Sequence, residues 1–161
     1  MSPEEESRHR KRGRGETVGQ GRSAKVCRYT LEPSASSLAT LREFIRVTLR
    51  PYRHIEPHVE DIVSATHEAC KNSLLHNPEN ECPVDVICRV LKNRVVLEVT
   101  DRGNGFDPEI LPPSPPDPEA LDGRGLLIIY ALMDKVEAET GEHGTRIRMQ
   151  KRFRPAAQAQ G

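Results

Sequence analysis

The chain has 161 residues, and its 24 Lys and Arg balance 24 Asp and Glu, so the formal net charge is zero. This length suits one domain, and the balanced charge disfavours a protein that mainly coats nucleic acid, which would be strongly basic. No apolar run approaches the roughly 18 residues of a transmembrane helix. The charged N-terminus has no apolar stretch behind it, which argues against a secretory signal. We therefore expect a cytoplasmic protein.

The four cysteines are consistent with that compartment. They are Cys27, Cys70, Cys82 and Cys88, and none forms a CxxC pair. A chain of this length can bury a core without disulfides, so we expect reduced thiols that serve mostly as small core residues.

The two ends of the chain differ in composition from its middle. Residues 1–23 contain Gly, Arg, Glu and Ser with almost nothing apolar, which predicts a disordered charged tail. The basic run at 8–12 would suit a nucleic acid or an acidic partner. However, three glutamates precede it and no aromatic residues interleave it, so a solvated tail is favoured. Residues 155–161 also read as a disordered end, which leaves 24–154 as one folded domain.

The first half of this domain predicts a strand and two helices. Apolar residues alternate from Cys27 to Leu31, as in a strand. A helix follows from Ser36 or Ser37 to about residue 49, where Pro51 stops it. A second helix opens at Pro57, because proline suits the first helical turn, and runs to about residue 75.

The second half predicts mainly strands. Residues 84–90 and 95–99 alternate and form a hairpin that turns at 92–93. Residues 107–122 carry six prolines and cannot form a helix interior. Residues 126–133 are apolar on all sides, which predicts a buried helix, and strands follow at 135–140 and 145–152. This order favours an α+β two-layer sandwich.

One polar row lies on the second helix. Glu68, Asn72 and His76 are spaced by four, which places them along one face, away from the apolar stripe. An amide oxygen can bind Mg²⁺ and a carboxylate can act as a base. The alternative is an ordinary solvated face. A zinc-binding HExxH motif is excluded, because Lys71 stands where its second histidine would be.

Two glycine-containing segments follow. Asp101, Gly103 and Gly105 form a DxGxG motif at a strand end, where a carboxylate acceptor lies beside backbone that a ligand can approach closely. Gly123 and Gly125 precede the apolar helix, whose N-terminus favours an anion. Taken alone, each segment is equally consistent with an ordinary turn or helix start. The Walker and Rossmann patterns are both incomplete.

Taken together and in this order, the segments resemble the GHKL ATPases, and within them the anti-sigma-factor serine/threonine kinases. Residues 68–76 look like the N box of that family, and residues 101–106 look like its first glycine box. Residues 123–127 look like the second glycine box, and Gly144-Thr145 like the last motif. The resemblance covers about residues 24–152. It implies a Bergerat-type ATP-binding fold, with a mixed, mostly antiparallel sheet and helices on one face.

The resemblance also implies roles for individual residues. Asp101 would accept a hydrogen bond from the adenine amine, with Thr145 supporting the base through water, and Asn72 would bind Mg²⁺. Glu68 would be the catalytic base. The segments that would approach the nucleotide are Gly103 and Gly105, and those that would hold the phosphates are Gly123, Arg124, Gly125 and Leu126. Residues of roughly 107–124 would form a mobile lid over ATP.

The implied activity is phosphorylation of a serine on a small anti-anti-sigma protein of the STAS type, with a sigma factor as a further partner and with homodimerisation. A histidine kinase is disfavoured, because the second glycine box is short and no phosphoacceptor-histidine domain is present. The alternative is a nucleotide-gated switch that binds its partner protein without transferring phosphate to it. A third reading, a DNA-binding regulator, rests only on the basic run. The role of His76 stays open, with support of the helix end preferred.

Overall fold

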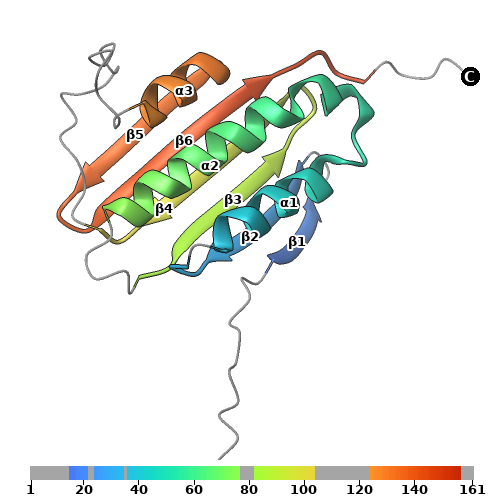
Figure 1. Ribbon diagram of the computed structural model, residues 1–161. Coiled ribbons are helices and arrows are strands. Elements are labelled where there is room, and N and C mark those ends of the chain that lie inside the picture. The colour runs from blue at the N-terminus through green and yellow to red at the C-terminus, as the bar shows by residue number, and fades with distance from the viewer. Residues whose placement is uncertain (1–14, 22–23, 35, 77–81, 104–123, 157–161) are drawn as a thin grey trace, which may run out of the picture.

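The computed structural model describes residues 15–21, 24–34, 36–76, 82–103 and 124–156. Its described strands form one six-stranded sheet in the order β1-β2-β3-β4-β6-β5, and every neighbouring pair is antiparallel. The helices cover one face of this sheet (Figure 1). The two-layer α+β sandwich expected from the sequence is confirmed. The described part of the sheet is wholly antiparallel rather than mixed.

The elements follow the predicted order closely. The strands and helices are β1 (Gly15–Gly21), β2 (Ala24–Leu31), α1 (Ser37–Leu49), the 3-10 helix η1 (Arg53–His58), α2 (Val59–Leu75), β3 (Val84–Val90), β4 (Arg94–Asp101), α3 (Gly125–Leu132), β5 (Lys135–Gly141) and β6 (Gly144–Arg152). The expected start of the second helix at Pro57 is displaced by two residues, because that proline lies inside η1.

Strand β1 corrects one expectation. It lies within residues 1–23, which were expected to be a disordered tail throughout, yet Gly15–Gly21 pairs with β2 through the register Gly15↔Tyr29 to Gly21↔Ala24. An edge strand is held by backbone hydrogen bonds to its neighbour, so it can form without a regular apolar pattern. The remaining residues of that range, 1–14 and 22–23, lie outside the described part of the chain.

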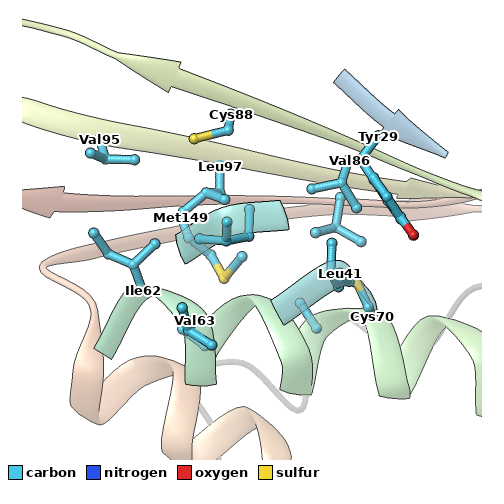
Figure 2. Packing of buried hydrophobic residues seen from close by; sticks show 14 of the residues in the cluster. Tyr29, Leu41, Ile62, Val63, Cys70, Val86, Cys88, Val95, Leu97 and Met149 are labelled. Carbon is cyan, nitrogen blue, oxygen red and sulfur yellow. The ribbon is translucent and has the colours of Figure 1, made fainter. Parts of the chain in front are cut away.

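The core lies between the sheet and helices α1 and α2. Alternate residues of the central strands point to the helices and are fully buried, among them Val86, Cys88, Leu97 and Met149. Figure 2 shows these side chains facing Leu41 of α1 and the apolar side of α2. This packing fixes α2 across the middle of the sheet, so the helix brings its polar row to one end of β4.

Helix α3 departs from the expectation of a fully buried helix. Of its eight residues, only Ile129 is buried, and Ile128 exposes 36% of its surface. The helix lies at the edge of the helical layer, beside α2 and over the outermost strand β5 (Figure 1). One of its sides therefore has no neighbour among the described residues.

Candidate functional site

The register of the sheet places Asp101 beside Thr145. These residues pair across β4 and β6, and both side chains are buried. The Oδ1 atom of Asp101 accepts hydrogen bonds from the backbone N–H of Gly103 at 2.9 Å and from that of Thr145 at 3.2 Å. The hydroxyl groups of Thr145 and Thr140 lie 3.2 Å apart. Among the described residues, both of these backbone donors to the buried carboxylate use Oδ1.

Two glycines allow the chain to pack tightly around that carboxylate. Gly144 has a φ of +122°, and a Cβ at this position would clash with the carbonyl oxygen of Asp101. A Cβ on Gly103 would lie 2.6 Å from the carbonyl oxygen of His76. Because Gly103 has no side chain, the residues after β4 can pack closely against the C-terminal end of α2.

The N-terminus of α3 lies against the polar row of α2. A Cβ on Gly125 would be 2.9 Å from Oε2 of Glu68 and 3.2 Å from both side-chain terminal atoms of Asn72. The Glu68 side chain is 16% exposed, and its Oε2 lies 3.9 Å from Nζ of Lys71. The structure therefore brings three of the predicted residues, Glu68, Asn72 and Gly125, into one contact group.

A pocket joins this contact group to Asp101. Its lining residues come from the end of α2, the end of β4, α3 and the start of β6, and they are Asn72, Ser73, His76, Asp101, Leu126, Thr145 and Ile147. The hollow, including its open mouth, has a volume of about 380 Å³. Asn72, Asp101, Leu126 and Thr145 were expected here from the sequence.

Ser73 and Ile147 were missed by the sequence reasoning. Ser73 follows Asn72 directly, and Ile147 lies two residues after Thr145 on the same face of β6, so neighbourhood along the element could have pointed to both. His76 was noted without a firm role. It lines the pocket, and its backbone N–H donates to the carbonyl oxygen of Asn72 at the helix end.

Some predicted residues lie outside the described part of the chain. These are Gly105, Gly123 and nearly all of the expected lid. Arg124 is described: it is exposed and stands immediately before the first turn of α3.

The donor set suits a metal ion that arrives together with a ligand. Among the described residues, no group of three or more His, Cys, Asp or Glu could hold a metal. The Asn72 amide and the Glu68 carboxylate nevertheless offer hard oxygen atoms at one point, which suits Mg²⁺ shared with substrate phosphates. The residues present therefore fit a phosphate-bound Mg²⁺ and not a preformed metal centre.

Comparison with known proteins decides the family. The model of the histidine kinase-like ATPase domain matches residues 31–151. An anti-sigma F factor of Clostridium acetobutylicum is 36% identical over 122 residues, covering 68% of this chain and 84% of the relative. The chain belongs to the histidine kinase-like ATPase domain family, in its anti-sigma-factor branch.

Other members of the family support this placement. A serine-protein kinase RsbW of Bacillus velezensis is 34% identical over 92 residues, covering 51% of this chain and 58% of the relative. The RsbU and RsbW domains of a Mycobacterium tuberculosis protein superpose with a TM-score of 0.61 at 22% identity, over 81% of this chain and 33% of that chain, which supports the fold.

None of the helices in the described residues could cross a membrane.

Proposed function

We propose that this chain is a Mg·ATP-dependent protein serine kinase of the anti-sigma-factor type. The observation that carries the proposal is the contact group at the start of α3. There Gly125 lies against both Glu68 and Asn72, while the other end of the same polar row reaches the pocket that contains Asp101. Asp101 can thus accept a hydrogen bond from the adenine, Asn72 can bind the metal, and the N-terminus of α3 can hold phosphates. These groups follow one another in the order in which ATP presents its adenine and its phosphates.

In this proposal Asp101 recognises the adenine. Its Oδ1 atom is engaged by two backbone N–H groups, and its Oδ2 atom accepts from the exocyclic amine. Thr145, paired with Asp101 across the strands, supports the base through water. The N-terminus of α3 would hold the phosphates, because the first N–H groups of a helix have no partner within the helix and, together with the helix dipole, favour negative charge.

Glu68 would act on the acceptor serine. Its carboxylate takes the proton of the hydroxyl group as the hydroxyl oxygen bonds to the γ-phosphorus, and the bond from that phosphorus to the β–γ bridging oxygen breaks to release ADP. Asn72 would hold Mg²⁺, which neutralises phosphate charge when bound. Most of the catalysis in such a reaction comes from positioning and electrostatic stabilisation, and a site built from backbone donors and two polar side chains can supply both.

The partner would be a small anti-anti-sigma protein of the STAS type, with a sigma factor as a second partner. Support comes from the relatives, which carry the names anti-sigma F factor and serine-protein kinase RsbW. The most informative experiment is a pulldown from the native host with the full chain as bait, in Mg·ATP and in Mg·ADP. Phosphosite mapping on the bound proteins should then find a phosphoserine only in the ATP arm.

A second candidate is a nucleotide-gated binding switch without kinase activity. The relatives named for sigma-factor inhibition favour a binding role, and such a role needs Asp101 and Asn72 but no base. The position of Glu68 favours the kinase, because its carboxylate and the Asn72 amide both lie within 3.2 Å of the Cβ position of Gly125. A partner captured in both nucleotide arms and never phosphorylated would support the switch instead.

A further inference from the structure

Lys71 lies beside Glu68 on α2, within the segment that resembles the N box, but the roles implied for that segment do not include it. On a helix of 100° per residue, Lys71 is placed about 60° to one side of Glu68 and Asn72 about 40° to the other. Glu68 therefore stands between them, and Lys71 lies on the side away from Asp101. This is the side on which the terminal phosphate and the acceptor would sit.

The contacts of Glu68 bring the lysine close to α3. Nζ of Lys71 is 3.9 Å from Oε2 of Glu68, and the same oxygen is 2.9 Å from the Cβ position of Gly125. The ammonium group is thus within about 7 Å of the first residue of α3, a distance that a rotation of its four-carbon stem can close.

The two members of this ion pair differ in freedom. The Glu68 side chain is 16% exposed, whereas that of Lys71 is 51% exposed. The pair is long, at 3.9 Å, and its lysine is half exposed, so the lysine can leave it at low cost. A triphosphate bound at α3 would place several negative charges beside the Glu68 carboxylate, and a cation that can move between the carboxylate and the phosphate would reduce their repulsion.

We propose that Lys71 binds the γ-phosphate of ATP, exchanging its ion pair with Glu68 for one with the phosphate. This assignment rests on the proposed nucleotide site and deepens it. The exchange frees Glu68 to accept the serine proton, and it makes the site sensitive to the presence of the terminal phosphate. ADP lacks that phosphate, so the lysine would stay with Glu68 when ADP is bound.

The test compares the affinities of the full chain for Mg·ATP and Mg·ADP by calorimetry. Lys71→Met removes the charge and keeps a good helix former of similar length. Lys135→Met is a matched control, because Lys135 also pairs with a glutamate, Glu137 at 2.8 Å, and its side chain is 48% exposed. Lys135 lies on β5, at the end of the strand away from Gly144.

We expect Lys71→Met to weaken ATP binding by about 10- to 100-fold, the range for loss of a charge-assisted contact, with ADP binding changed less than about twofold. Lys135→Met should leave both affinities unchanged, and Lys71→Arg should keep most of the preference for ATP. In a Glu68→Gln background, Lys71→Met should still remove the preference, because the lysine contacts phosphate directly.

Four outcomes would overturn the assignment. Equal weakening of ATP and ADP, or no weakening of either, refutes the role of Lys71 while leaving the nucleotide site intact. Loss of the effect in the Glu68→Gln background means that Lys71 acts only by neutralising Glu68. A parent protein that binds neither nucleotide refutes the proposed nucleotide site, and the assignment of Lys71 with it.

Discussion

Replacing Asp101 by Asn should weaken ATP binding and leave the fold intact. The Asn side-chain carbonyl can take the place of Oδ1 and keep both backbone donors, now 2.9 Å and 3.2 Å away. Its NH₂ group then stands where Oδ2 stood and faces the adenine amine, so two donors meet. Losing a charge-assisted hydrogen bond costs about 1.5–3 kcal/mol, which is about a 10- to 150-fold rise in Kd.

The assay is calorimetric titration with Mg·ATP and with Mg·ITP, whose purine carries a carbonyl oxygen where adenine carries the amine. The parent should prefer ATP, whereas Asp101→Asn should prefer ITP, because its NH₂ group can donate to that oxygen. Thermal melts should show a fold that survives the substitution, since the two backbone donors remain satisfied. Equal ATP binding by parent and variant, or an unchanged preference between the two nucleotides, would refute the assignment of Asp101 to the base.

Three further predictions follow from the same contacts. Gly125→Ala should reduce phosphoryl transfer about 100-fold with little change in melting temperature, because the added methyl would displace the flexible ends of the Glu68 and Asn72 side chains. Gly141→Ala, where a Cβ meets nothing within 4 Å, is the control, and equal activity of the two variants would contradict the argument. Burial raises the pKa of Cys88 to about 12 and raises that of Cys70 further. Titration with a thiol reagent at pH 8 should therefore modify these two only after unfolding, and their rapid reaction in the native protein would be contrary evidence. Burial, with the nearby Arg42 charge, lowers the pKa of His67. The unfolded chain then binds more protons below about pH 6.5, so stability should fall as the pH drops through that value and His67→Gln should flatten the fall; urea titrations that give the two proteins the same pH slope would count against this.

Periodicity predicted most of the fold because most elements bury one face. The alternation in β3 and β4 and the apolar stripe of α2 follow directly from packing against a single core. Strand β1 was missed, because an edge strand is held through backbone hydrogen bonds that leave little trace in the side chains. The burial of α3 was overestimated for a related reason: an apolar composition does not say how many neighbours a helix has.

The site was predictable as a set of residues but not as a geometry. The four-residue spacing of Glu68 and Asn72 predicted a shared face, and the structure places both against Gly125. The pairing of Asp101 with Thr145 could not be read from the sequence, because the two residues are 44 positions apart and meet only through the register of β4 with β6. The assignments of Gly105 and Gly123, which lie outside the described residues, stay predictions.

The claim that this protein is a kinase is tested most directly by the rate at which Glu68→Ala transfers phosphate from Mg·ATP to the protein captured by the parent. A base contributes about 10²- to 10⁴-fold to the rate and little to ground-state binding. The variant should therefore lose transfer while binding Mg·ATP as the parent does, whereas Asn72→Ala should lose Mg·ATP binding itself. Transfer by Glu68→Ala at the parental rate would contradict the role of the base, and absence of transfer by a parent that binds its partner would establish the switch.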